Sequence, residues 1–300
     1  EKISDDAVVG LENYKPYGCW HCPIACGGIV NVNEGRYPVG ETHKPEYETV
    51  GAFGPMCMNN DLESIFKLND MCNRSGLDTI SAGTTLAFAM ECFENGIITT
   101  SDTDGIDLTW GNAEAMIAVT AKMIAREGFG DVLADGVKRA AEKIGAGADQ
   151  YAMHVGGQEP GLHNALFLPS RGTGFVCDPT PGRHTAAPMA RIDGGPGQYA
   201  PYPELQIGEF DRYSYSGKGP MSATASQYLQ VGSSAGVCIM PMMFFGNYPL
   251  VEFFNAVTGW DLDVAEVLTA GARIQTLRHC FNLREGIAPA DVKLPDRMVG

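Results

Sequence analysis

The sequence has no apolar run of the roughly 18–20 residues that a membrane-spanning helix needs. It is poor in basic residues, with 21 Lys and Arg against 36 Asp and Glu, so its formal net charge is −15. An acidic surface repels nucleic acid and anionic membranes, and we expect neither as a partner. The sequence also shows no internal repeat, no low-complexity segment and no signal peptide at its start.

What the sequence does contain is enough apolar material for a sizeable core. Of its 300 residues, 44% are hydrophobic and 19% are charged, which excludes a disordered or fibrous chain and leaves room for two domains. It begins Glu1-Lys2-Ile3 without a Met, which predicts a piece of a longer protein. Nine cysteines, an odd number with three close together, favour reduced cytoplasmic thiols with some metal ligands over a secreted disulfide framework.

Apolar residues at helical spacing dominate the first half of the chain. They predict four helices, over 61–75, 81–95, 112–127 and from Asp131 to Gly145. The Gly/Ala-rich segment 145–150 is the candidate domain boundary, which gives domains over 1–150 and 151–300.

The second half begins differently. Residues 151–222 are rich in Gly and Pro and have little periodicity, so we expect irregular loops and short helices there. Helices are predicted near 222–232 and 248–257, and a third begins at Asp263, where Glu266 completes a capping-box pattern. The predicted fold class is therefore mainly α, as two largely helical domains with long Gly/Pro-rich loops.

The strongest chemical motif is Cys19-Trp20-His21-Cys22-Pro23-Ile24-Ala25-Cys26. A short C-x2-C-x3-C turn can direct three thiolates at three irons of a cubane iron–sulfur cluster, whose fourth iron needs a distant Cys. The alternatives are a zinc site, which more often uses two short Cys/His pairs, and plain buried thiols. Cys238 is a plausible fourth ligand, but spacing alone does not choose it over Cys177 or Cys280.

Two similar hexamers form a second motif. Residues 73–78 (Asn-Arg-Ser-Gly-Leu-Asp) and 233–238 (Ser-Ser-Ala-Gly-Val-Cys) each follow a predicted helix, with Gly in the fourth place. Gly allows a tight turn and a close approach of the backbone to a ligand. Each hexamer alone is also typical of an ordinary helix C-terminus, but two copies, one with a possible cluster Cys, favour a shared function.

Together these motifs resemble the tungsten-containing aldehyde:ferredoxin oxidoreductases. The resemblance also includes the segments Pro45-Glu46-Tyr47-Glu48-Thr49, Asn60-Asp61-Leu62, Gly76-Leu77-Asp78-Thr79-Ile80-Ser81, Arg126-Glu127-Gly128-Phe129-Gly130-Asp131, Gly259-Trp260-Asp261, Phe281-Asn282-Leu283 and Leu294-Pro295. It covers the family's second and third domains, both largely helical around a buried cofactor, whereas the family's N-terminal β-rich domain is not in this sequence.

The resemblance implies a tungsten (or molybdenum) bis-molybdopterin cofactor beside one 4Fe-4S cluster. Family positions that ligate the cluster match Cys19, Cys22, Cys26 and Cys238. Family positions that hold the two pterins match Asn73, Gly76, Leu77, Asp78, Ser233, Gly236 and Val237.

The sequence departs from the family pattern at two kinds of position. The family's hexamers begin with Asp, but here each loses the formal charge: Asn73 keeps an acceptor and Ser233 is shorter. We expect pterin binding to survive, with water filling the gap at Ser233. Some relatives bridge two subunits through an iron held by an E-x-x-H motif; here Lys67 and Asp70 stand there, so that iron is not expected, although a homodimer is still possible.

The resemblance also implies two acid–base residues, Glu48 and His184, which match a family carboxylate and histidine close to the tungsten. A carboxylate and an imidazole facing the metal suit the proton traffic of aldehyde oxidation. Read from the residues alone, both are more typical of ordinary loop side chains, and the resemblance reverses that balance. Glu46 is the near rival of Glu48, and His163 is a weaker candidate for the substrate path.

Three functions compete. The first is aldehyde oxidation to a carboxylic acid, with electrons passed through the cluster to ferredoxin or another electron-transfer protein. The second is another redox reaction on the same scaffold, as in class II benzoyl-CoA reductases. A bond from Cys57 to tungsten would favour it, although Cys57 is more typical of a buried thiol. The third is an electron-transfer iron–sulfur module without pterin catalysis. Neither the substrate nor the choice between tungsten and molybdenum follows from the sequence.

Overall fold

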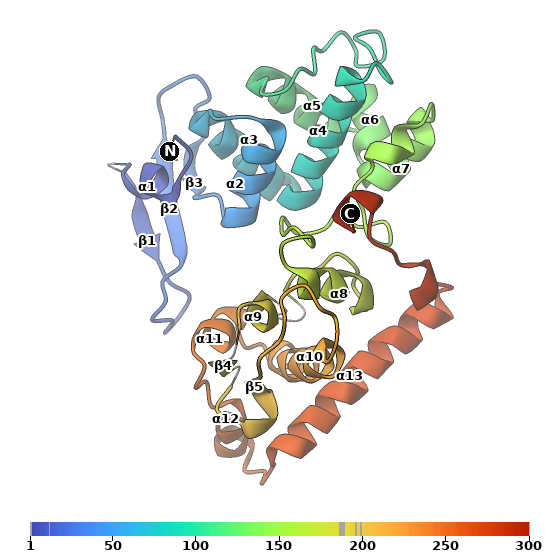
Figure 1. Ribbon diagram of the computed structural model, residues 1–300. Coiled ribbons are helices and arrows are strands. Elements are labelled where there is room, and N and C mark those ends of the chain that lie inside the picture. The colour runs from blue at the N-terminus through green and yellow to red at the C-terminus, as the bar shows by residue number, and fades with distance from the viewer. Residues whose placement is uncertain (1, 12, 186–189, 196, 199, 300) are drawn as a thin grey trace. The chain divides into compact units, whose positions relative to one another are not determined.

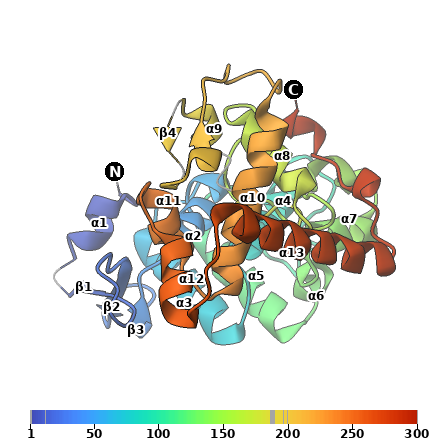
Figure 2. The ribbon, with the colours of Figure 1, turned by 90° about the horizontal axis from the view of Figure 1, so that it is seen from below.

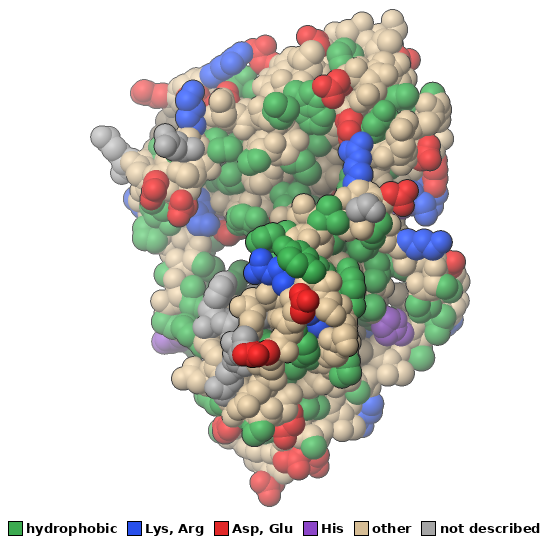
Figure 3. Space-filling model, viewed as in Figure 1, with side chains coloured by type: hydrophobic (Ala, Val, Ile, Leu, Met, Phe, Trp, Pro, Cys, Tyr) green, Lys and Arg blue, Asp and Glu red, His purple; other side chains and the backbone are tan. Residues whose placement is uncertain are grey.

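The computed structural model describes residues 2–11, 13–185, 190–195, 197–198 and 200–299 (Figure 1). They form two compact units, Glu1–Leu162 and His163–Gly300, which are described separately below. The domain boundary expected at 145–150 stays a prediction. Among the described residues no helix is both long and apolar enough to cross a membrane. On the face seen in Figure 3, acidic and basic side chains are interspersed.

The first unit opens with a small sheet that the sequence patterns did not predict. After α1 (Asp5–Val9), three short antiparallel strands follow in spatial order: β1 (Lys15–Tyr17), β2 (Gly27–Val32) and β3 (Gly40–His43). Val30 and Thr42 are paired neighbours that face inward, whereas the neighbouring pair Ile29 and His43 lies on the other face. Strands of three to six residues are too short for alternation to be distinguished from a loop.

Three of the predicted helices of this unit are confirmed with small shifts of their ends: α3 (Leu62–Ser75), α4 (Thr79–Glu94) and α5 (Ala113–Ala125). They are preceded by α2 (Tyr47–Phe53), which the sequence patterns did not predict, and by a 3-10 turn at Pro55–Cys57. Polar side chains begin three of them: Asp61, Asp78 and Asn112 each accept a hydrogen bond from a backbone N–H of the first turn. Helix α4 is buried from Ala82 to Met90 and is the centre of the core.

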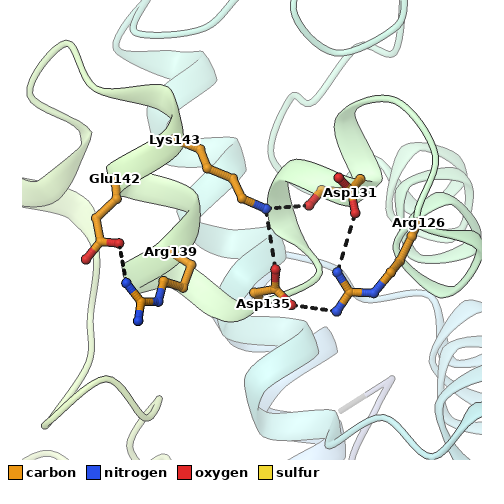
Figure 4. A network of polar contacts seen from close by, with 6 residues as sticks. All are labelled: Arg126, Asp131, Asp135, Arg139, Glu142 and Lys143. Atoms are coloured by element: carbon orange, nitrogen blue, oxygen red, sulfur yellow. Dashed lines mark hydrogen bonds and ion pairs between the residues drawn. The ribbon is translucent and has the colours of Figure 1, made fainter.

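The single helix predicted from Asp131 to Gly145 is wrong. The structure has two helices, α6 (Phe129–Leu133) and α7 (Gly136–Ile144), which are separated where Gly136 has φ +85°. That left-handed backbone cannot continue an α-helix. Figure 4 shows the ion pairs around this break: Arg126 contacts Asp131 and Asp135, and Lys143 also reaches Asp135. The Arg126–Asp131 motif of the sequence therefore builds a helix junction.

The second unit begins with loops and short elements, as predicted. They are α8 (Pro169–Cys177), α9 (Ala190–Asp193), a two-strand pair of β4 (Gly197–Gln198) and β5 (Gln206–Ile207), and a 3-10 turn at Pro203–Leu205. The later helices are α10 (Lys218–Ser234), α11 (Ile239–Phe244), α12 (Leu250–Thr258) and α13 (Val264–Arg284), followed by 3-10 turns at Pro289–Asp291 and Asp296–Met298. The capping box of Asp263 and Glu266 is present, which confirms the predicted start of α13.

Helices α10 and α13 pack side by side, as Figures 1 and 2 both show. Their backbones touch at Gly271, where an added Cβ would lie 2.2 Å from the Gln227 carbonyl oxygen. A second fixed point of this unit is a buried ion pair, with Lys218 Nζ 2.7 Å from Asp193 Oδ1. Ser170 also donates to Asp193, so α8, α9 and α10 meet at one carboxylate.

Candidate functional site

The cysteine loop connects β1 to β2 and turns its thiols outward. Cys22 N–H donates to the Cys19 carbonyl at 2.9 Å, and the backbone is left-handed at His21 and Ala25. Cys19 and Cys26 are exposed, and Cys22 is half-buried; all three are free thiols. Plain buried thiols are therefore excluded for this loop, and the donor set fits a metal centre. The neighbouring Trp20 is 90% exposed, so it does not pack into the core of its unit.

The first hexamer connects α3 to α4. Gly76 follows the last turn of α3 with φ +70°, and the N–H of Leu77 donates to the Cys72 carbonyl at 3.0 Å. This is the six-residue closure of a Schellman motif. Asp78 then caps α4 by accepting a hydrogen bond from the Ser81 N–H at 2.7 Å.

The second hexamer repeats this local structure between α10 and α11. Gly236 has φ +76°, and the N–H of Val237 donates to the Gly232 carbonyl at 2.9 Å. Cys238 stands at the N-cap of α11, in the place that Asp78 takes at α4. The helix-end interpretation is thus confirmed for both hexamers, and it leaves the ligand-binding interpretation open.

The two hexamers also share one pattern of exposure. In each, the first four residues and the sixth are exposed, and only the aliphatic fifth residue is half-buried. A Cβ added at Gly76 or Gly236 would have no neighbour within 4 Å in the chain. Both glycines are therefore required by their backbone conformation and not by crowding within the protein. Two bare backbone turns of equal shape fit a group that is bound through peptide N–H and C=O.

Glu48 and its rival Glu46 have different surroundings in the structure. Glu46 is exposed and pairs with Lys44 at 2.9 Å. Glu48, in the first turn of α2, is half-buried, and its Oε2 accepts a hydrogen bond from the Leu162 N–H at 2.8 Å. This bond spans 114 residues and fixes the orientation of the Glu48 carboxylate.

In the second unit, His184 lies beside His163. Their ring centroids are 4.9 Å apart at an angle of 48°, and both side chains are half-buried. The Arg171 guanidinium donates to the carbonyl of His184. The sequence treats His163 and His184 as separate candidates, and their pairing was missed because it joins two loop residues with no periodic relation.

Cys57 is a core residue of the first unit. Its side chain is fully buried, and its Sγ donates to the carbonyls of Ala52 and Gly83 at 3.3 and 3.6 Å. Desolvation raises the pKa of this thiol to about 12, which disfavours the thiolate that metal ligation needs. The buried-thiol interpretation of Cys57 is the one that the structure supports.

Other sequence candidates are already engaged or lie apart from the motifs. Asp70, at the second E-x-x-H position, is buried, accepts from Thr42 and pairs with Arg74 at 2.8 Å. Cys177 and Cys280 are free and exposed, as Cys238 is. Of these three cysteines, only Cys238 belongs to a hexamer.

Comparison with known proteins defines the class. The family model "Aldehyde ferredoxin oxidoreductase, domains 2 & 3" matches residues 1–300, so the chain belongs to the aldehyde ferredoxin oxidoreductase family. The resemblance read from the sequence is thereby confirmed, together with the mainly helical fold class.

Three known proteins illustrate the similarity in sequence or fold. The tungsten-containing aldehyde ferredoxin oxidoreductase of Pyrococcus furiosus is 35% identical over 94% of this chain and 44% of its own length. That of Thermococcus kodakarensis is 32% identical over 99% of this chain and 47% of its own. The active-site complex BamBC of benzoyl coenzyme A reductase has the same fold, with a TM-score of 0.73 at 22% identity over 95% of this chain and 47% of that chain. The chain therefore spans less than half the length of these relatives.

Proposed function

We propose that this chain is part of a tungstopterin oxidoreductase that oxidises an aldehyde to a carboxylic acid and passes the electrons through a 4Fe-4S cluster to ferredoxin or a similar protein. The observation that carries the proposal is the pair of equivalent hexamers in a chain of this family. The free thiols of the described cysteines support a reducing, cytoplasmic setting.

The hexamers fit a bis-pterin cofactor. Their exposed backbone turns offer N–H and C=O groups, and Asn73 and Ser233 offer exposed polar side chains at the first position. Gly76, Leu77, Asp78, Gly236 and Val237 complete the proposed binding residues. When bound, a tungsten or molybdenum pterin supplies the two-electron chemistry that no amino-acid side chain provides.

The cysteines fit the cluster. Cys19, Cys22 and Cys26 are accessible thiols on one short loop, and Cys238 is an accessible thiol within the second hexamer. We assign the four to one 4Fe-4S cluster. Cys238 would then belong both to a cofactor-binding turn and to the cluster, which suits a path for electrons from the cofactor to the protein surface.

Glu48 and His184 are the proposed acid–base residues. Oxidation of an aldehyde consumes one water and releases two electrons and two protons. We assign Glu48 to accept a proton from the attacking water and His184 to hydrogen-bond the carbonyl oxygen and relay a proton. The bond from Leu162 to Glu48 supports this assignment because it orients the half-buried carboxylate, whereas Glu46 is an exposed partner of Lys44.

The competing functions are less well supported. A bond from Cys57 to tungsten would favour the benzoyl-CoA reductase-like chemistry. Burial of the Cys57 thiol disfavours this bond because it raises the pKa of the thiol to about 12. An electron-transfer module without pterin would have no need of two matched turns.

The test uses the intact protein that contains this chain. Tungsten, molybdenum and iron are measured in the protein, and a panel of aldehydes is offered with a low-potential dye as electron acceptor. Tungsten or molybdenum together with aldehyde-dependent dye reduction supports the proposal. Iron without either metal, or metal with activity only toward an aromatic thioester, overturns it.

A further inference from the structure

The segment from Asp178 to His184 follows α8 directly and carries the proposed acid–base histidine. It is fixed locally, because the Thr180 N–H donates to Asp178 Oδ1 at 2.8 Å and the Gly182 N–H donates to the Phe175 carbonyl at 2.9 Å. The guanidinium of Arg171, on α8, holds the carbonyl of His184 itself. The segment is therefore held against α8 near both of its ends.

Two side chains of α13, one helical turn apart, hydrogen-bond the start of the same segment. Arg278 Nη2 lies 3.1 Å from Asp178 Oδ1 and 2.8 Å from Thr180 Oγ1. Asn282 Nδ2 donates to the Pro179 carbonyl at 2.7 Å. The Asp178 carboxylate is 3% exposed, so this ion pair is shielded from the solvent that weakens surface pairs.

Helix α13 also packs against α10. Gly271 lets the two backbones touch, and Gln275 donates to Ser226 on α10. Helix α10 then runs without interruption to Ser234, inside the second hexamer. Along one face, α13 thus contacts the helix that ends in the hexamer, and one turn later it holds the segment that carries His184.

We infer that α13 is the element that sets the position of His184 relative to the second hexamer, and that Arg278 is its positioning residue. Arg278 acts through Asp178 and Thr180 and has no assigned contact with a reacting group. This inference rests on the proposed role of His184. It matters because a displacement of about 1 Å in an acid–base group can cost roughly 100-fold in rate.

The test is the substitution Arg278→Met in the intact protein, which keeps most of the apolar stem of the side chain and removes all its donors. We expect kcat to fall about 10- to 100-fold while KM stays within about twofold, with metal and iron contents unchanged. Hydrogen exchange of the peptide that covers 178–184 should become faster. The matched control is Arg284→Met on the same helix, because Arg284 is exposed and its ion pair is with the adjacent Glu285.

A double-mutant cycle with His184→Asn distinguishes positioning from a general loss of structure. If Arg278 acts through His184, the double variant should be no slower than His184→Asn alone. Multiplied losses, or equal effects of the Arg278 and Arg284 variants, overturn the inference. If Arg278→Met is poorly folded, Asn282→Ala replaces it, with a smaller kcat loss expected and the same cycle. Full activity of His184→Asn would refute the proposed role of His184, whereas slow kinetics of His184→Asn with normal kinetics of Arg278→Met would refute only the positioning role.

Discussion

Leu77 and Val237 make the same hydrogen bond in two distant parts of the chain. Each N–H reaches the carbonyl five residues earlier, at Cys72 and Gly232, across a glycine with φ of +70° or +76°. The two turns thus agree in hydrogen bonding, backbone sign and exposure, although only the glycine is identical between the hexamers. A repeated backbone shape with changed side chains is what recognition through the backbone requires.

Replacing either hexamer glycine tests that recognition. We expect Gly76→Ala and Gly236→Ala to lower the free energy of unfolding by only about 1 kcal/mol, because Ala is disfavoured at positive φ and meets no neighbour. By contrast, the pterin and tungsten contents of these variants should fall strongly, although the fold is retained. Gly259→Ala is the matched control, since Gly259 also ends a helix at φ +73° with open space around it. Equal cofactor contents in all three variants would contradict the assignment of the hexamers.

The four cluster cysteines should be separable from the buried ones. Cys22→Ala and Cys238→Ala are expected to remove the cubane signal of the reduced protein in electron paramagnetic resonance and most of the iron. Cys57→Ser should keep both and instead lower the melting temperature, because it places a hydroxyl in a fully buried site. A normal cubane signal in Cys238→Ala would move the fourth ligand to Cys177 or Cys280.

Glu48→Gln isolates the proton function of this carboxylate. The Gln side chain can still accept the Leu162 N–H, so the local structure and the metal content should be retained. Turnover should fall by about 10²–10⁴-fold, the usual range for loss of a general acid or base. Glu46→Gln should change turnover little, since it removes only a surface pair with Lys44. Comparable losses in both variants would count against Glu48.

Thiol labelling should divide the cysteines by burial. Desolvation raises the pKa of Cys57, Cys72 and Cys92 from 9.0 to about 12, so at pH 8 they should resist alkylation in the folded protein. A raised folded-state pKa contributes stability that is complete below about pH 9 and is lost as the pH rises toward 12. We therefore expect a falling melting temperature above pH 9, measured by thermal scans. Mass-spectrometric labelling of Cys57 at pH 8, without unfolding, would show that this burial is wrong.

Lys218→Met tests the buried ion pair of the second unit. The substitution leaves Asp193 charged and buried without its cation, which typically costs about 3–5 kcal/mol. Chemical denaturation should show this loss, and Lys293→Met, which removes an exposed surface charge, should change stability by less than about 0.5 kcal/mol. A neutral effect of Lys218→Met would contradict this prediction.

The sequence alone determined the elements whose causes are local. The helix that follows Asp61, the capping box at Asp263 and the left-handed turns at Gly76 and Gly236 each depend on a few neighbouring residues, so they could be predicted and are observed. The C-x2-C-x3-C loop could be predicted for the same reason. The ordered series of motifs was enough to indicate the family, which the comparison confirms.

Only the tertiary structure decided what depends on distant partners. The short sheet at the start forms because its strands pair across loops, and Cys57 is buried because Ala52 and Gly83 close around it. The hydrogen bond that distinguishes Glu48 from Glu46 comes from Leu162, 114 residues away from Glu48. The ion pair of Arg278 with Asp178 joins residues that are 100 positions apart in the sequence. Such contacts arise from packing, which composition and periodicity do not encode at any one position.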